Sequence, residues 1–207
     1  MTQFGMEILD GAGLSSLPVT SESFVFDKLV ISNNRTAVKL GIKDNSFTPI
    51  IFTSYFRSHA EPAGDGGLIL KWVDGDWEIT TPYCELNCYI FIPAKVKNKQ
   101  NSQTWGAIIY NEEGNEMLIS GTRPLIIYYD RTIDQKLPFT NCACSPAYLG
   151  RAFQPIGISG VWGLYLITAT VRDGYIRGMR YVTSTASGGS DKQEPEYIPY
   201  INVDNYI

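Results

Sequence analysis

Short strand-like runs separated by turn residues are the feature that most constrains the fold of this chain. β-branched and aromatic residues recur in these runs, and Gly, Asn, Asp or Pro separates one run from the next. No long segment carries apolar residues at the spacing of one helix face. The pattern predicts strands at residues 4–9, 24–32, 36–42, 50–55, 68–73, 77–80, 89–92, 105–110, 117–120, 125–130, 161–170, 175–182 and 197–207.

Turn residues predict three hairpins among these runs. Asp74-Gly75-Asp76 and Asp173-Gly174 each lie between two apolar runs. An Asp-Gly pair favours a tight hairpin, because both central residues of a type I′ turn need positive φ. A third hairpin is expected across 112–115. The sequence therefore predicts a mainly β fold of antiparallel sheets, arranged as a β-sandwich or in barrel-like form.

The segment 131–157 has no clear period and carries Pro138, Pro146 and Pro155. We expect a long irregular loop there, of the kind that often makes contacts or joins domains. The chain has 207 residues, which suits one large all-β domain or two small ones. We expect a single unit over 1–207, with two β-sandwiches over 1–95 and 100–207 as the alternative.

Charge and hydropathy limit the partners. Net charge is −4 and no stretch is dominated by Lys or Arg; the densest, at Lys95, Lys97 and Lys99, is expected to be a polar loop. A nucleic-acid partner would need a basic surface to offset phosphate charge, so none is expected. The first residues lack the basic start and apolar centre of a secretory signal, and no apolar stretch is long enough to span a bilayer. We expect synthesis in the cytoplasm.

Tyrosine and tryptophan supply candidate contact residues. The 13 Tyr residues suit both half-buried strands and protein interfaces. Four tryptophans fall on expected strands, where alternate positions share a face: Trp72, Trp77, Trp105 and Trp162. Burial in the core is the default for such residues, but one or two exposed rings would make a carbohydrate- or receptor-binding face.

Four cysteines form two close pairs, Cys84 with Cys88 and Cys142 with Cys144. Two such pairs could place four thiolates around zinc or an iron–sulfur cluster, although neither has the two-residue spacing of structural zinc sites. In an extended strand the first pair would hold its sulfurs about 13 Å apart, too far for a disulfide. We expect four reduced, partly buried thiols and no cofactor, with a metal site and disulfides as alternatives.

Catalytic patterns are weak. His59 is the single histidine and lies in a polar stretch, where a surface position is expected. Carboxylates cluster near two of the expected hairpins: Asp74, Asp76, Glu78, Glu112 and Glu113. Asp is common in turns, and no spacing marks a catalytic pair. We expect no enzymatic activity, with a carboxylate-based glycan hydrolase as an alternative.

The opening residues carry a family resemblance. Phe4-Gly5-Met6-Glu7-Ile8-Leu9 followed by Asp10-Gly11-Ala12-Gly13 is similar to the start of a family of small proteins encoded among the tail-tip genes of long-tailed bacteriophages and prophages. That family's pattern is an aromatic residue, Gly, alternating residues and an Asn/Asp-x-x-Gly turn. A second strand follows, and Thr20-Ser21-Glu22-Ser23-Phe24-Val25-Phe26 takes that place here. The resemblance is specific over about the first 30 residues.

The resemblance implies a structural virion protein of the tail tip or adsorption apparatus. It implies partners among other tail proteins, a homo-oligomer in a symmetric assembly, and no catalytic residues. A host surface glycan or receptor is a further partner to consider. Synthesis in the host cytoplasm and release within the virion would agree with the absence of a signal sequence.

Overall fold

The computed structural model describes residues 23–32, 36–58, 67–81, 84–100, 108–110, 116–119, 121–156, 161–184, 190–192 and 195–207. Its contacts form two compact units, Met1–Asp27 with Phe91–Leu125 and Lys28–Ile90 with Ile126–Ile207. Each unit is built from two separate stretches of chain. The prediction of one unit and its alternative of two sandwiches both stay predictions. The first expected strand, 4–9, lies outside the described residues.

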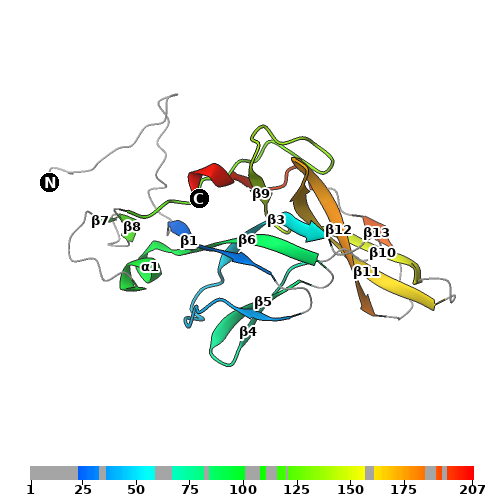
Figure 1. Ribbon diagram of the computed structural model, residues 1–207, viewed down its shortest axis with the longest axis horizontal. Coiled ribbons are helices and arrows are strands. Elements are labelled where there is room, and N and C mark those ends of the chain that lie inside the picture. Colours follow the sequence, from blue (N-terminus) through cyan, green and yellow to red (C-terminus); the bar gives the residue numbers. More distant parts are fainter. Residues whose placement is uncertain are drawn as a thin grey trace. The chain divides into compact units, whose positions relative to one another are not determined.

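A nine-stranded mixed sheet dominates the structure (Figure 1). Its main path runs β1-β6-β3-β11-β10-β13, β12 pairs with β11, and β9 pairs with both β14 and β3. The strand order has two open ends, so the sheet does not close into a barrel, and the prediction of a mainly β fold is confirmed. The strands are β1 Phe24–Ile31, β3 Ile50–Ser58, β6 Cys84–Pro93, β9 Cys142–Cys144, β10 Tyr148–Ile156, β11 Val161–Arg172, β12 Tyr175–Ser184, β13 Asp191–Lys192 and β14 Tyr200–Asn202.

Both Asp-Gly hairpins are confirmed. β4 (Ile69–Val73) pairs antiparallel with β5 (Asp76–Thr80), and β2 (Val38–Lys39) completes a three-stranded sheet. Positive φ occurs at Asp74 (48°) and Gly75 (79°), as a type I′ turn requires. The β11–β12 turn repeats this geometry, with φ of 53° at Asp173 and 75° at Gly174.

The smaller unit contains a helix that the sequence did not indicate. α1 (Ala94–Gln100) covers the lysines that were expected in a loop, so that prediction was wrong. Pro93 directly before the helix suits its start, and Ala94 and Val96 are buried. Lys97 Nζ lies 2.6 Å from Asp27 Oδ1, and the Asp27 side chain is 4% exposed. This tertiary ion pair stabilises a helix of seven residues, which is too short for its apolar spacing to be recognised in the sequence.

The third hairpin is confirmed as a strand pair. β7 (Ile108–Tyr110) and β8 (Glu116–Ile119) pair antiparallel. The turn at 112–115 lies outside the described residues.

The prediction of an irregular loop over 131–157 was wrong for the second half of that segment. Residues 131–141 carry no strand, but β9 and β10 occupy 142–144 and 148–156. All three β9 residues are buried, so no polar–apolar alternation marks the strand. A strand was predicted at 125–130, and that prediction was wrong. The segment makes only an isolated bridge, from Tyr128 to Tyr200.

The end of the chain docks as expected, although as a shorter strand. β14 pairs antiparallel with β9, placing Tyr200 opposite Cys144 and Asn202 opposite Cys142. The 3-10 helix η1 (Val203–Asn205) follows, and Asn202 caps it by accepting a hydrogen bond from Asp204 N at 3.1 Å. Tyr200 and Tyr206 are 1% and 2% exposed, so this segment is part of the core.

β3 pairs with two different strands at consecutive residues, an arrangement that we call the β3 fork. Thr53 lies opposite Cys144 of antiparallel β9, and Ser54 lies opposite Val171 of parallel β11. The Thr53 hydroxyl, which is fully buried, lies 3.5 Å from the Cys144 carbonyl oxygen and 3.3 Å from the Thr170 hydroxyl. Both buried hydroxyls are therefore paired at the point where β9 and β11 separate.

A glycine substitution tests the turn argument. Gly75→Ala should lower the free energy of unfolding by about 1–2 kcal/mol, because its φ of 79° strains a Cβ although nothing lies within 4 Å of that position. Asp74→Asn is the control, since Asn tolerates positive φ. Urea unfolding of the two variants measures the difference. Equal stability of both variants would contradict the turn assignment.

Candidate functional site

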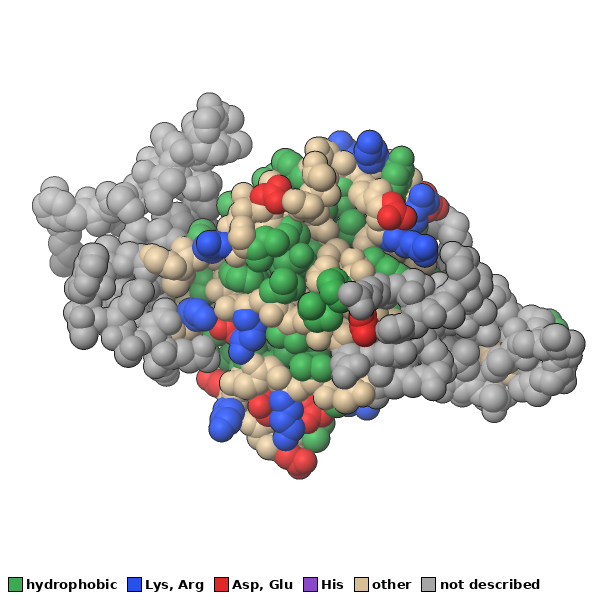
Figure 2. All heavy atoms as spheres, in the orientation of Figure 1, with side chains coloured by type: hydrophobic (Ala, Val, Ile, Leu, Met, Phe, Trp, Pro, Cys, Tyr) green, Lys and Arg blue, Asp and Glu red, His purple; other side chains and the backbone are tan. Residues whose placement is uncertain are grey.

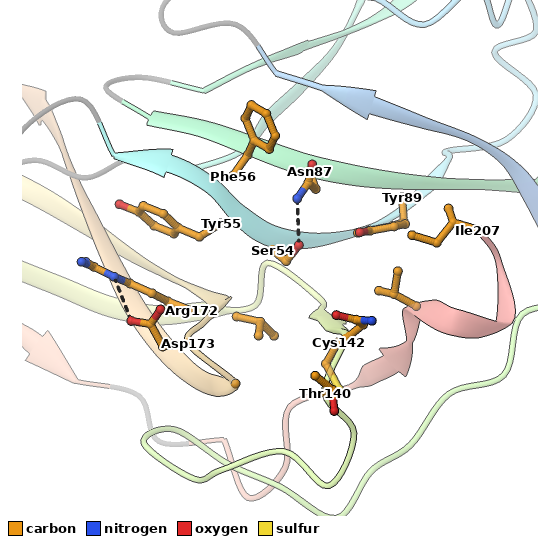
Figure 3. A pocket seen from close by; sticks show the side chains of 14 residues that line it. Ser54, Tyr55, Phe56, Asn87, Tyr89, Thr140, Cys142, Arg172, Asp173 and Ile207 are labelled. Carbon is orange, nitrogen blue, oxygen red and sulfur yellow. Dashed lines mark hydrogen bonds and ion pairs between the residues drawn. The ribbon is translucent and has the colours of Figure 1, made fainter.

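A pocket of about 540 Å³ opens at the β3 fork (Figure 3). Its walls come from five parts of the larger unit: β3, β6, residues 140–142, the β11–β12 turn and the end of the chain. Because β9 and β11 leave β3 at consecutive residues, the side chains that follow the fork line a hollow. We call this hollow the fork pocket.

One wall is a row of hydrogen-bonded polar groups on two neighbouring strands. Asn87 Nδ2 lies 3.4 Å from the Ser54 hydroxyl oxygen and donates to it. Tyr89 also hydrogen-bonds to Ser54, and Figure 3 shows its hydroxyl turned toward that residue. Burial raises the pKa of Tyr89, and the hydrogen bond to Ser54 partly opposes the rise. Tyr89 is therefore a neutral phenol at physiological pH.

The opposite wall carries the charged groups. The Arg172 guanidinium carbon lies 5.1 Å from the centre of the Tyr55 ring, in a cation–π arrangement. Arg172 Nε also lies 3.6 Å from Asp173 Oδ2. One cationic and one anionic side chain, those of Arg172 and Asp173, are among the described lining residues, so the side-chain charges of the fork pocket balance. Phe56, which is 42% exposed, adds an apolar rim.

Residues 140–142 and the end of the chain form the remaining wall. Thr140 and Asn141 are exposed, and Asn141 Nδ2 donates to Asp204 Oδ1 at 2.7 Å. Cys142 is 5% exposed, and its thiol lies 3.4 Å from the Phe139 carbonyl oxygen. Val203 and Ile207 add apolar atoms. The fork pocket therefore combines hydroxyl, carboxamide and aromatic groups in one concave surface.

The structure places the four cysteines on two strands. Cys84 and Cys88 are on β6, Cys142 and Cys144 are on β9, and β3 lies between those strands in the sheet. All four are buried, and none forms a disulfide. Within the described part of the chain, no three His, Cys, Asp or Glu side chains gather as a metal would require. The metal alternative stays a prediction that metal analysis tests.

Burial dominates the acidity of these thiols. It raises the pKa of Cys88 to about 12 and that of Cys142 to about 11, and it also raises the pKa of Cys144. The neighbouring Cys84 adds to the rise at Cys88. A thiol with so high a pKa is protonated near pH 7 and is a poor nucleophile or metal ligand in this state.

The structure separates the candidate aromatic residues. Trp72 and Trp77 face each other across the β4–β5 hairpin, with ring centres 5.6 Å apart at 69°. Both are partly buried, and Trp77 Nε1 donates to the Asp44 carbonyl oxygen at 3.0 Å. Trp162 is on β11 and is 47% exposed. Trp105 lies outside the described residues, and no tryptophan is among the described lining of the fork pocket.

The carboxylates near the β4–β5 hairpin have structural partners. Asp76 is 7% exposed and accepts a hydrogen bond from Ile42 N at 2.9 Å. Glu78 lies 3.8 Å from Lys39 Nζ, and Asp74 forms the turn. His59, Glu112 and Glu113 lie outside the described residues.

Sequence reasoning missed most of the fork pocket. Of its lining residues, Cys142 was named as a candidate site residue, and 140–142 fall in the segment expected to make contacts. Ser54, Asn87 and Tyr89 carry no motif, because strand pairing between distant segments brings them together. The Asp173-Gly174 turn was detectable, but its position beside β3 was not.

Comparisons with known proteins gave no match: no family model and no curated protein resembles the sequence, and no solved structure resembles the fold. None of the described helices is long and apolar enough to cross a membrane.

The raised thiol pKa values predict that the chain loses stability in alkali. A thiol in the unfolded chain titrates near its ordinary pKa of 9.0, below the pKa values in the folded chain, so the unfolded state loses these protons first. The stabilisation is complete below about pH 8 and falls as the pH rises through about 9 toward 11–12. Tyr200 and Tyr206, whose pKa values burial also raises, act in the same direction above about pH 10.

Urea unfolding at several pH values measures this loss. The urea midpoint should fall from about pH 8 to about pH 10, and the double variant Cys88→Ala, Cys144→Ala should show a smaller fall. A midpoint that stays constant over this range in the unsubstituted protein would contradict the burial of the thiols.

Proposed function

We propose that this chain is a structural protein of a bacteriophage tail that works by assembling with copies of itself and with other tail proteins. The resemblance of residues 4–13 and 20–26 to the tail-tip family supports the class. A mainly β fold supports it further, since paired strands give the rigid surfaces that repeated subunits need. The proposal places the chain in the virion after synthesis in the host cytoplasm.

Large hydrophobic side chains on the surface carry this proposal. Among the described residues, nine are exposed: Leu29, Ile31, Phe56, Ile126, Tyr129, Tyr148, Trp162, Tyr197 and Ile207. Figure 2 shows hydrophobic side chains reaching the surface among charged ones. Five of the nine are aromatic (Phe56, Tyr129, Tyr148, Trp162 and Tyr197), and aromatic residues are enriched at protein interfaces.

The most exposed aromatics lie on two paired segments of the larger unit. Tyr129 and Tyr197 are 57% and 50% exposed. Each is within three residues of the antiparallel bridge between Tyr128 and Tyr200, whose rings stack with centres 5.4 Å apart. The stack of partly buried Tyr128 on buried Tyr200 fixes the backbone that carries the two exposed phenol rings. We call Tyr129 and Tyr197 the tyrosine patch.

Hydrogen bonds hold the two segments that carry the tyrosine patch, and this rigid support suits the patch to a permanent interface. Tyr200 OH donates to Asp130 Oδ1 at 2.6 Å, and Ile198 N donates to the Arg131 carbonyl oxygen at 2.8 Å. The two segments are therefore held in place before a partner arrives, so binding loses little conformational entropy. A second copy of the chain is the partner that a symmetric tail assembly supplies.

Self-association and presence in the virion test the proposal. The purified protein should form an oligomer in size-exclusion chromatography with light scattering. The variant Tyr129→Ser, Tyr197→Ser should weaken self-association at least about tenfold, because aromatic residues dominate interface energetics. Lys71→Ser, at an exposed site of the β4–β5 hairpin outside this set of hydrophobic residues, is the control and should leave the oligomer intact.

Mass spectrometry of purified particles supplies the second readout. The chain should be present in virions of the phage that encodes it, and particles lacking its gene should have altered tail tips. A chain that is monomeric at all concentrations and absent from virions would contradict the proposal.

A further inference from the structure

We propose that the fork pocket binds a neutral hexose unit of a glycan. This inference goes beyond assembly and does not depend on it, because it rests on the groups that line the pocket. A volume of about 540 Å³ falls within the range of small-molecule sites, roughly 300–1,000 Å³. It is large enough for one sugar ring with room for the adjoining part of a chain.

The hydrogen-bonding groups of the fork pocket match those of a sugar. Each sugar hydroxyl both donates and accepts, so it pairs well with groups that do the same. Hydroxyls and carboxamides have this double capacity, and the lining offers both kinds, in Ser54, Tyr89, Thr140, Asn87 and Asn141. Asn87 uses one of its two N–H groups in the 3.4 Å contact with Ser54, which leaves the other to a ligand.

The balance of charge favours a neutral ligand. Arg172 is the cation among the described lining residues and lies beside Asp173, with 3.6 Å between Nε and Oδ2. A phosphate or carboxylate ligand that approached Arg172 would also meet the Asp173 carboxylate. Repulsion between the two anions would offset the attraction to the guanidinium. A neutral sugar hydroxyl can accept a hydrogen bond from the Arg172 guanidinium and donate one to the Asp173 carboxylate.

Aromatic and exposed polar side chains both line the fork pocket. Phe56 lies at the rim with 42% exposure, where the C–H face of a sugar ring could pack against it. Thr140, Asn141 and Asp173 are exposed lining residues, so the fork pocket opens to solvent. Figure 3 shows Asn87 and Ser54 meeting between these groups. An open pocket of this kind suits a sugar within or at the end of a glycan chain.

Nuclear magnetic resonance of the full chain tests the inference directly. The probes are the methyl glycosides of glucose, galactose, mannose and N-acetylglucosamine, each titrated to about 100 mM, since single sugars typically bind with weak millimolar Kd values. At least one should give saturable shifts confined to the amides around Ser54, Asn87, Thr140 and Arg172. Inorganic phosphate should give none there.

Two substitutions with a matched control identify the contacts. Asn87→Leu and Thr140→Val keep side-chain size and remove hydrogen-bonding groups, so each should weaken sugar binding about tenfold. Gln135→Leu removes an exposed carboxamide outside the fork pocket and should change the Kd less than about twofold. Thr140→Val alters an exposed position and so remains informative if Asn87→Leu does not fold.

Three results would overturn the inference. The first is no saturable shift with any of the four glycosides. The second is sugar-induced shifts at the Trp72–Trp77 hairpin in place of the fork pocket. The third is phosphate binding at the fork pocket that Arg172→Gln abolishes, which would make the site an anion site.

Discussion

The structure of the larger unit depends on the pairing of β3 with two strands at once. Thr53 and Ser54 pair with residues of β9 and β11 that lie 91 and 117 residues further along the chain. Two buried threonine hydroxyls satisfy each other at the point of divergence, and a backbone carbonyl accepts from one of them. An unpaired hydroxyl at this depth would cost about 1–3 kcal/mol. The paired threonine hydroxyls therefore favour this strand pairing over arrangements that would separate them.

The same divergence explains the fork pocket and much of the core. Cys144 and Val171 point into one buried cluster that includes Tyr200 and Ile176. Beyond it the strands separate, and polar residues such as Ser54, Asn87 and Thr140 join apolar ones in the lining of the hollow. Cys88 and Cys144 lie on the buried side, where the exclusion of water raises the pKa values of their thiols. The polar lining of the fork pocket and the buried thiols thus both result from the same strand arrangement.

Local sequence signals predicted those parts of the fold, such as tight turns, that depend on the backbone conformation of a few adjacent residues. Gly75 and Gly174 marked two turns because positive φ selects glycine. The β9 strand was missed because burial on both faces removes alternation, and α1 was missed because a distant carboxylate, Asp27, supports it. The fork pocket could not be predicted, since nothing in Ser54 or Asn87 specifies which distant segments will lie beside them.

The central claim is that the paired hydroxyls of Thr53 and Thr170 hold the fork together, and a double-mutant cycle measures this coupling. Thr53→Val should lower the free energy of unfolding by about 1–3 kcal/mol, because it leaves the buried Thr170 hydroxyl without this partner. Thr170→Val should cost less, because the Thr53 hydroxyl keeps its hydrogen bond to the Cys144 carbonyl oxygen. The double variant should cost less than the sum of the two, with a coupling of at least about 0.5 kcal/mol. Strictly additive losses, or single variants as stable as the unsubstituted protein, would contradict the account.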